Sequence, residues 1–270
     1  KINEIKAYAM LDAATSRNEH SNDHADHSRE EPGARPVPGP SPRPDEDGNL
    51  TNSTDDVKSF FYLEIFSGSG RLSKSLEKLL SSVGRKDVKV IQIELKNGDD
   101  LLRSDVFQRV QRLVNSGYCL GVWLAPPCSS WSTSRRNDGN KAAMPLRDPH
   151  HVLGLSGLSA NDQRKVTEAN ILVERTTQLA LNCILQRVPF AIENPYHSLM
   201  WMVPGMMHII SLPGVTSSRV DFCQFGEKYH KKTKIVSFDL DITAVAKVCK
   251  AKHGKCSRSG EPHALLSGAV

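Results

Sequence analysis

The feature that most constrains the fold is an alternation of short apolar runs with helix-like segments, which begins at Lys58. Four runs have the length and composition of buried strands: Phe60–Phe66, Val88–Ile93, Cys119–Ala125 and Val188–Asn194. Helical patterns separate them around Leu72–Leu80, Val106–Leu113 and Val166–Leu185. Strands that alternate with helices are typical of a mostly parallel α/β sheet. We therefore expect one α/β domain over residues 58–270.

The end of this region has a different pattern. A shorter helix is expected over Ser198–Ile210, broken at Pro204-Gly205. Val220–Gly226 and Lys232–Phe238 flank a polar turn, which predicts a pair of antiparallel strands. The sheet is thus expected to be parallel in its main part and to end in an antiparallel hairpin.

Residues 1–57 differ in character from the rest. Ile2–Ala14 has a helical pattern with Ile2, Ile5, Tyr8 and Ala9 on one face. Ser16–Asp56 is polar and contains the Pro/Gly run Gly33–Pro44, a composition that buries too little apolar surface to offset chain entropy. Residues 1–57 are therefore expected to form a disordered extension and linker.

Bulk composition narrows the function only slightly. The net charge of +5 and the pI near 8.9 suit a polyanionic partner but do not identify one. No apolar run approaches the ~20 residues of a membrane-spanning helix. The six cysteines are dispersed, which favours a reducing, intracellular setting, nuclear or cytoplasmic. No membrane association is expected.

The segment Leu63–Leu72 reads as strand, glycine turn and helix. Gly68 and Gly70 allow a tight turn that brings the backbone close to a ligand, although the same pattern also forms ordinary βα turns. It lacks the third glycine of the dinucleotide fingerprint and the Lys-Ser/Thr of a phosphate-binding loop. Glu94, at the end of the second strand, has a carboxylate that can accept hydrogen bonds from the hydroxyls of a ribose. Asp100 or a neighbouring aspartate suits an adenine amino group.

Two residues suited to chemistry follow the ends of later strands. Cys128 comes after Pro126-Pro127, which stiffen the turn and hold a thiol where ligands bind in open α/β sheets. Glu193, in the segment Phe190–Pro195, ends the next strand. A thiol becomes a nucleophile as its thiolate, and a carboxyl group with a raised pKa can donate a proton. Both residues are candidate catalytic groups.

Leu63–Gly70, Ala125–Ser132 and Ile192–Pro195, in this order, resemble the cofactor, nucleophile and glutamate motifs of DNA cytosine-5 methyltransferases. Asp221–Phe238 resembles a fourth motif of the compact branch found in phages and mobile elements, although Lys231-Lys232-Thr233 lacks its proline.

The resemblance implies a Rossmann-like class I fold that binds S-adenosyl-L-methionine. It implies that the Cys128 thiolate adds to carbon 6 of cytosine while Glu193 holds ring nitrogen 3 and the exocyclic amine. The implied cofactor-binding residues are Glu64, Phe66, Gly68, Gly70, Glu94, Asp100 and Pro126.

The implied partner is DNA. A cytosine inside a duplex is out of reach, so the target is flipped out or already single-stranded. The loop after Cys128 is charged and contains Arg147. Its positive charges could bind phosphates, but such a loop is equally often only solvated. The residues expected to contact nucleic acid are Ser129, Trp131, Arg135, Arg136, Gln224, Lys232 and Lys234.

Two other functions stay open. Only residues 239–270 follow the hairpin, too few for a separate target-recognition domain, so an inactive nucleic-acid-binding module of a mobile-element polyprotein is the alternative. An amino-methylating enzyme is less favoured, because such sites place an aromatic residue, not a thiol, after the two prolines.

The tail has residue types that suit zinc. Cys249, Cys256 and His263 fit that chemistry, but their spacing matches no common zinc finger. No metal is expected, and a structural site in the tail is a minor alternative.

Overall fold

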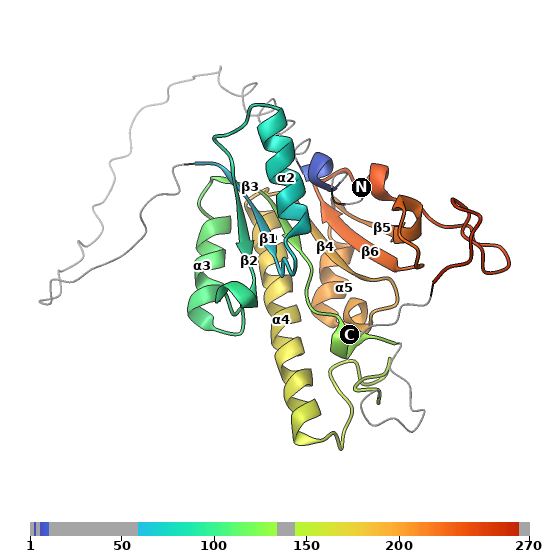
Figure 1. Ribbon diagram of the computed structural model, residues 1–270. Coiled ribbons are helices and arrows are strands. Elements are labelled where there is room, and N and C mark those ends of the chain that lie inside the picture. The colour runs from blue at the N-terminus through green and yellow to red at the C-terminus, as the bar shows by residue number, and fades with distance from the viewer. Residues whose placement is uncertain (1–2, 4–5, 11–58, 134–143, 265–270) are drawn as a thin grey trace, which may run out of the picture.

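The computed structural model describes residues 3, 6–10, 59–133 and 144–264. A six-stranded sheet has the order β2-β1-β3-β4-β6-β5 (Figure 1). Neighbours in β2-β1-β3-β4 pair in parallel, whereas β6 is antiparallel to both β4 and β5. The strands are β1 (Phe61–Ile65), β2 (Lys89–Ile93), β3 (Cys119–Leu124), β4 (Phe190–Pro195), β5 (Val215–Asp221) and β6 (Lys232–Phe238). The predicted mixed α/β sheet with a terminal hairpin is confirmed.

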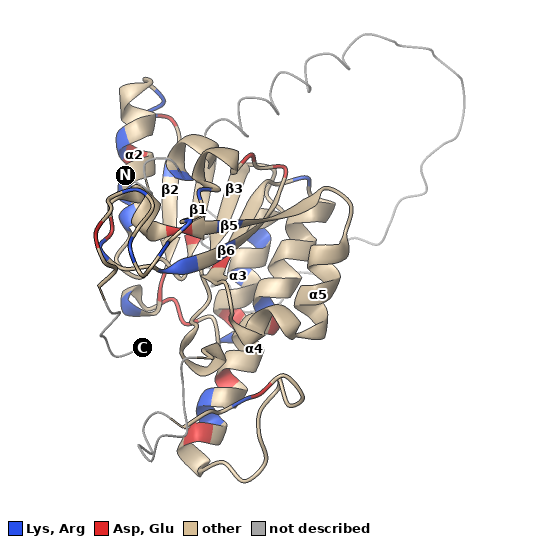
Figure 2. Cartoon of the chain, turned by 90° about the vertical axis from the view of Figure 1, so that its right-hand side faces the viewer, with Lys and Arg blue, Asp and Glu red and all other residues tan. Residues whose placement is uncertain are grey.

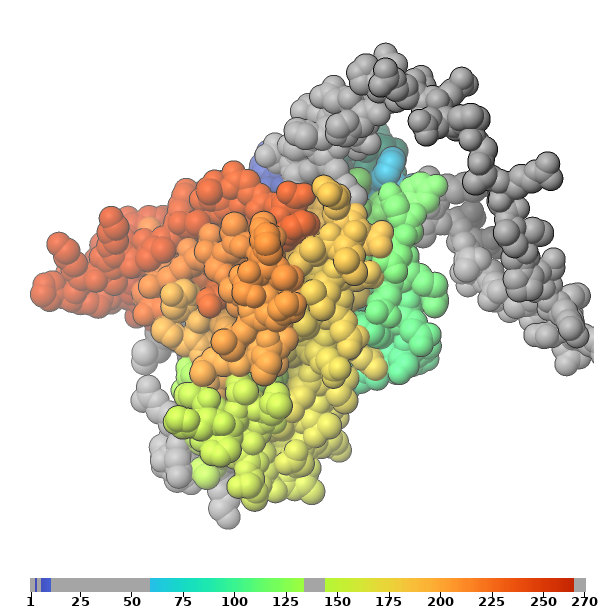
Figure 3. Space-filling model, turned by 180° about the vertical axis from the view of Figure 1, so that it is seen from behind, coloured from blue at the N-terminus to red at the C-terminus, as the bar shows by residue number. Residues whose placement is uncertain are grey.

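Helices cover both faces of the sheet. On one face, α3, α4 and α5 pack side by side (Figure 3) and bury the larger apolar cluster, which includes Val110, Leu179 and Ile209. On the other face, α2 buries Leu72 and Leu76 in a second cluster. The helices are α2 (Arg71–Ser82), α3 (Ser104–Val114), α4 (Ala160–Leu185) and α5 (Pro204–Ser211). The result is a three-layer structure with the sheet buried in the middle.

Two expected boundaries are wrong. Pro204 begins α5 and does not break a helix, because the first helical position needs no N–H donor. The preceding residues form the separate 3-10 turn Leu199–Met202. The strand expected at Val220–Gly226 ends at Asp221, and Phe222–Phe225 forms another 3-10 turn. Local turn geometry determines where α5 begins and where β5 ends, and the spacing of apolar residues cannot predict it.

The described part of the N-terminal extension packs on the domain. Residues 6–10 are helical, and Ala7 and Met10 are buried in the same cluster as α2. Tyr8, expected on the same helix face as Ala9, is 59% exposed, whereas Ala9 and Lys6 are buried. Residues 6–10 therefore belong to the folded body, unlike the linker expected for all of 1–57. Residues 11–58 lie outside the described part of the chain.

No described helix combines the length and apolar character needed to cross a membrane.

Candidate functional site

A cavity of about 410 Å³ opens at the carboxyl ends of β1, β3 and β4. Its walls come from the β1–α2 turn, the turn after β3, the end of β4, the segment between β5 and β6, and the N-terminal helix. The structure thus brings together residues from distant parts of the sequence. Of the predicted site residues, Glu64, Phe66, Gly68, Pro126, Cys128 and Glu193 line this cavity.

The two glycines of the β1–α2 turn have different tasks. Both have positive φ, 56° at Gly68 and 62° at Gly70, which a residue with a side chain adopts only under strain. A Cβ at Gly68 would meet nothing within 4 Å, whereas one at Gly70 would lie 2.7 Å from the Gln92 Oε1 atom. Gly68 therefore leaves open space in the cavity, whereas Gly70, which does not line it, lies against the Gln92 side chain of β2.

Glu64 is held by the helix that follows the turn. Its carboxylate accepts hydrogen bonds from the Ser73 backbone N–H, at 2.8 Å, and from the Ser73 hydroxyl. Burial raises the pKa of Glu64, and the bonds from Ser73 oppose that rise. Glu64 lies in the cavity wall and at the same time ties β1 to α2.

Glu94 and Asp100, expected to bind the cofactor, lie outside the cavity lining. Glu94 is nevertheless next to it, because its carboxylate accepts a hydrogen bond from the Gly68 N–H at 2.6 Å. Asp100 accepts one from the Leu102 N–H at 2.8 Å and so closes a local turn. Glu94 is therefore bonded to the glycine turn beside the cavity, whereas the hydrogen bond of Asp100 is confined to its own turn.

Cys128 lies at the cavity because the ends of β3 and β4 are tied together. The Asn194 side chain, which is buried, donates a hydrogen bond to the Pro126 carbonyl at 2.8 Å. The Cys128 carbonyl in turn accepts one from the Trp131 N–H at 3.0 Å. These bonds fix the backbone on both sides of the thiol, which is partly exposed to the cavity.

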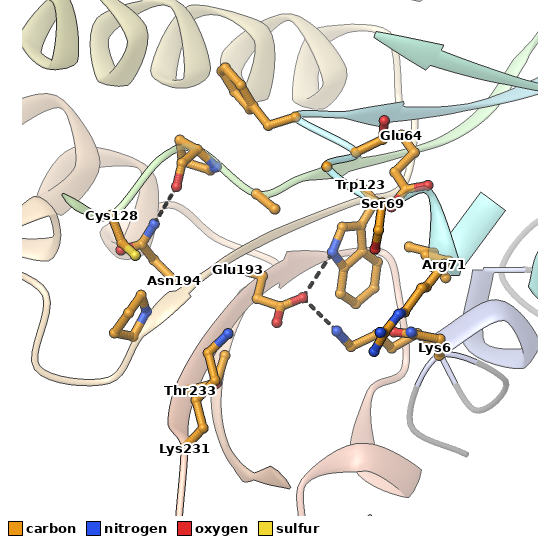
Figure 4. Close-up of a pocket in the computed structure, with 18 of the residues that line it drawn as sticks. Lys6, Glu64, Ser69, Arg71, Trp123, Cys128, Glu193, Asn194, Lys231 and Thr233 are labelled. Atoms are coloured by element: carbon orange, nitrogen blue, oxygen red, sulfur yellow. Dashed lines mark hydrogen bonds and ion pairs between the residues drawn. The ribbon is translucent and has the colours of Figure 1, made fainter. Parts of the chain in front are cut away.

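Glu193 forms an ion pair at the floor of the cavity (Figure 4). Its carboxylate lies 2.5 Å from the Lys6 ammonium and accepts a hydrogen bond from the Trp123 indole at 3.2 Å. Burial alone would raise the pKa of Glu193, but the charge and hydrogen bond of Lys6, with help from Lys231, hold it below its usual value. In this arrangement Glu193 therefore lacks the raised pKa that would help it to donate a proton.

Lys6 is the cavity residue that the sequence did not reveal. Its side chain is only 5% exposed, and its ammonium lies 5.1 Å from the ring centroid of Trp123 and 5.4 Å from that of Phe222. The helical pattern of the N-terminal segment was visible in the sequence, but nothing there indicated a carboxylate partner 187 residues away.

Trp131 does not lie where a base could contact it. It is completely buried, and the Arg147 guanidinium stacks on its ring at 3.4 Å. Arg147 is also buried and donates to the Val152 and Val166 carbonyls; burial lowers its pKa to about 10. In this structure the pair packs in the interior, so it presents neither the Trp131 ring to a base nor the Arg147 guanidinium to a phosphate.

The remaining residues expected to contact nucleic acid do not all lie at the cavity, and the geometry of β6 determines which of its residues do. Lys231 and Thr233 line the cavity, whereas Lys232 and Lys234 do not, because alternate residues of a strand point to opposite faces. Lys234 lies over the rings of Tyr196 and Trp201, and burial lowers its pKa. Ser129 is exposed beside Cys128. Gln224 contacts the sulfurs of Cys223 and Cys256. Arg135 and Arg136 lie outside the described residues.

The tail cysteines and histidine form a second cluster. Cys249, Cys256 and His263 converge with Cys223, which sequence reasoning placed in a strand. The cluster is separate from the cavity, since none of these residues lines it.

Comparisons with known proteins give little further information. No protein-family model matches the sequence. No curated protein sequence matches it either. Among solved structures, a weak match is found to EhMeth, a methyltransferase of Entamoeba histolytica, at 14% identity and a TM-score of 0.33, over 72% of this chain and 55% of that chain. The chain spans about half the length of that protein, and a likeness at this level carries no argument about fold or function.

Proposed function

We propose that this protein is an S-adenosyl-L-methionine-dependent DNA cytosine-5 methyltransferase. The observation that carries the proposal is that the Cys128 thiol, the Glu193 carboxylate and the open Gly68 turn all face one cavity. A nucleophile, a group that holds a base and a place for a nucleotide-like cofactor are the three elements that this reaction requires.

The strand order supports a class I methyltransferase fold. From β1 the chain passes to β2 on one side, and β3 then lies on the other side of β1, so the sheet has a switch point between β1 and β3. Ligands of open α/β sheets bind at the carboxyl ends of strands at such a point. The cavity lies there, and the antiparallel β6 lies between β4 and the edge strand β5, which agrees with the antiparallel hairpin that the resemblance implies.

The residues around the glycine turn suit the cofactor. Gly68 leaves its side of the turn free of side-chain atoms, and Glu94 places a carboxylate 2.6 Å from the Gly68 amide at the ends of β1 and β2. When bound, S-adenosyl-L-methionine supplies an electrophilic methyl group. In the proposal, Glu94 binds the ribose hydroxyls, and Phe66 and Pro126 form the walls on either side.

The protein's own groups supply the rest of the chemistry. The Cys128 thiolate forms a bond to carbon 6 of cytosine, which makes carbon 5 nucleophilic enough to take the methyl group. Glu193 holds ring nitrogen 3 and the exocyclic amine, and so stabilises the electron density that moves into the ring. A water molecule then takes the proton from carbon 5, the electrons of that C–H bond restore the double bond to carbon 6, and the bond between carbon 6 and sulfur breaks to release the Cys128 thiolate.

Lys6 must leave Glu193 before a base can bind there. The ammonium takes one carboxylate oxygen at 2.5 Å, and the cytosine edge needs the same group. Once Lys6 withdraws, the burial that remains raises the pKa of Glu193, which favours a carboxyl group able to donate to ring nitrogen 3. In this proposal the structure represents a form in which Lys6 occupies the position of the base.

The proposal is tested by incubating the protein with methyl-labelled cofactor and a mixture of DNA and RNA, then identifying the modified base. We expect 5-methylcytosine in DNA and none with Cys128→Ala. A label on an amino nitrogen, or equal transfer by the Cys128→Ala variant, would contradict the mechanism. No transfer together with no affinity for S-adenosyl-L-methionine would instead support an inactive nucleic-acid-binding module.

A further inference from the structure

Three thiols and one imidazole nitrogen meet where the C-terminal tail, residues 246–264, contacts the turn after β5. Cys223 comes from that turn, and Cys249, Cys256 and His263 come from the tail. The four ligand atoms lie within 4.8 Å of one another. The Cys249 Sγ atom is 3.9 Å from the Cys256 Sγ atom and 3.7 Å from the His263 Nε2 atom.

These distances fit the edges of a tetrahedron around zinc. With Zn–S bonds of about 2.3 Å and a Zn–N bond of about 2.0 Å, the ligand atoms are about 3.8 Å apart for two sulfurs and about 3.5 Å apart for sulfur and nitrogen. A disulfide needs sulfurs about 2.05 Å apart and would leave a third thiol and the imidazole unused. No disulfide joins any two of the six cysteines, all of which lie within the described residues.

The tail has almost no apolar core to hold it. Within residues 246–264, only Cys249 and Cys256 are buried, and the local apolar cluster consists of Cys223, Cys249 and Cys256. Ordering a backbone costs about 1–2 kcal/mol per residue. A short segment that buries so little apolar surface needs a disulfide or a metal. Figure 1 shows the tail, in red, projecting from the β5–β6 edge.

Donors surround the sulfurs in the way that thiolate ligands require. The Ser257 N–H and hydroxyl point at the Cys249 sulfur, at 3.4 and 3.5 Å. The Gln224 amide lies 3.6 Å from the Cys223 sulfur and 3.7 Å from that of Cys256. Such outer contacts orient metal ligands and tune their charge.

The imidazole ring is also held in place. His263 stacks on His230, with ring centroids 4.6 Å apart and planes 21° apart. His230 Nε2 in turn lies 2.9 Å from a carboxylate oxygen of Asp221, which is fully buried. The same oxygen accepts the Cys249 N–H at 2.8 Å, so one carboxylate positions both the ring stack and a cysteine ligand.

We propose that Cys223, Cys249, Cys256 and His263 form a closed, structural zinc site. The site joins the tail to the β5–β6 segment, which also forms a wall of the cavity. Phe222, next to Cys223, lines that cavity, as does Tyr229, whose backbone pairs with Ala264. The zinc therefore stabilises one wall of the cavity. It also fixes the position of the tail, which carries five Lys or Arg residues and one Glu (Figure 2).

The first test is the metal content of the full chain, purified without a metal-affinity tag. Native mass spectrometry is expected to show one zinc per chain. His263→Asn is expected to lower zinc affinity more than about 100-fold, and Gln224→Ala about tenfold. His253→Asn is the matched control, since His253 is exposed in the same tail with a positive φ that asparagine tolerates, and it is expected to keep the metal. Cys128→Ala is expected to keep it too.

The second test separates a zinc site from a folding defect. In the wild-type protein, a chelator is expected to speed tryptic cleavage at Lys250, Lys252 and Lys255 about tenfold or more, without a change in cleavage within the sheet. A chain that binds no zinc when zinc is supplied would overturn the proposal, as would a Cys249–Cys256 disulfide or equal cleavage with and without chelator. These readouts do not depend on methyl transfer, so they stand or fall separately from the proposed function.

Discussion

Removal of the Lys6 charge is expected to destabilise the protein by an amount that depends on pH. Lys6→Met keeps most of the side chain that packs near Trp123 and Phe222 but removes the ammonium from Glu193. The two side chains are 5% and 13% exposed, so their pair is largely buried. Removing one member of a buried pair costs about 3–5 kcal/mol, because the other charge is left without a partner.

Glu193 limits this cost by taking up a proton. At pH 7, protonating a glutamate with an ordinary pKa near 4.3 costs about 3.7 kcal/mol, and burial of Glu193 in the variant lowers that figure. The Trp123 hydrogen bond remains and compensates part of the loss. We therefore expect Lys6→Met to lower the free energy of unfolding by about 2–4 kcal/mol at pH 7.

The pH dependence has a definite sign. In the wild type the lowered pKa of Glu193 stabilises the fold above the unfolded pKa, and this contribution is lost as the pH falls through the folded value. In Lys6→Met, burial raises the pKa of Glu193, so stability falls as the pH rises through the new value. The difference between the two proteins should therefore be largest at neutral pH and shrink towards acid.

Urea denaturation at several pH values between about 4 and 8 measures this difference. The control is Lys78→Met, which changes an exposed lysine on α2. A double-mutant cycle with Glu193→Gln is expected to give a coupling energy of at least about 1 kcal/mol at pH 7. A loss in Lys6→Met that is the same at all pH values, or a coupling energy indistinguishable from zero, would refute the reasoning.

Three further substitutions test other parts of the site. Gly68→Ala and Gly70→Ala should each cost about 1–2 kcal/mol for their left-handed backbone, because the Gln92 amide near Gly70 can move aside. Only Gly68→Ala should also weaken cofactor binding in calorimetry, and an equal loss of binding in Gly70→Ala would contradict the role given to Gly68. Trp131→Ala should lower the free energy of unfolding, measured by urea denaturation, by about 3–5 kcal/mol. Unchanged stability together with weaker DNA binding would instead indicate that Trp131 contacts a base. Asn194→Ala should cost about 1–3 kcal/mol by freeing the Pro126 carbonyl and should slow reaction at Cys128; unchanged stability and rate would contradict its positioning role.

The sequence predicted the sheet and the centre of the cavity well, for a physical reason. Strands buried on both faces leave continuous apolar runs, so β1 and β3 could be located from composition alone. Because parallel strands place their carboxyl ends at one edge, Cys128 and Glu193 were expected to lie close to each other and to Gly68. All three line one cavity.

Contacts made by distant or irregular segments could not be predicted in this way. Lys6 reaches Glu193 only because the N-terminal helix packs on the α2 face of the sheet, and no periodicity encodes that docking. Trp131 and Arg147 looked like surface groups of a charged loop, but they stack on each other in its interior. Cys223 joins the tail cysteines across 26 residues of chain, a separation that fits no spacing rule for zinc.

The central claim is that the Cys128 thiol attacks cytosine, and a covalent trap tests it most directly. Single-stranded DNA that contains 5-fluorocytosine is incubated with the protein and S-adenosyl-L-methionine, and the products are separated under denaturing conditions. We predict a protein–DNA adduct that requires the cofactor, maps to Cys128 by mass spectrometry and is absent in Cys128→Ala. An adduct of equal yield in Cys128→Ala, or methylated product without any adduct in the wild type, would contradict the account.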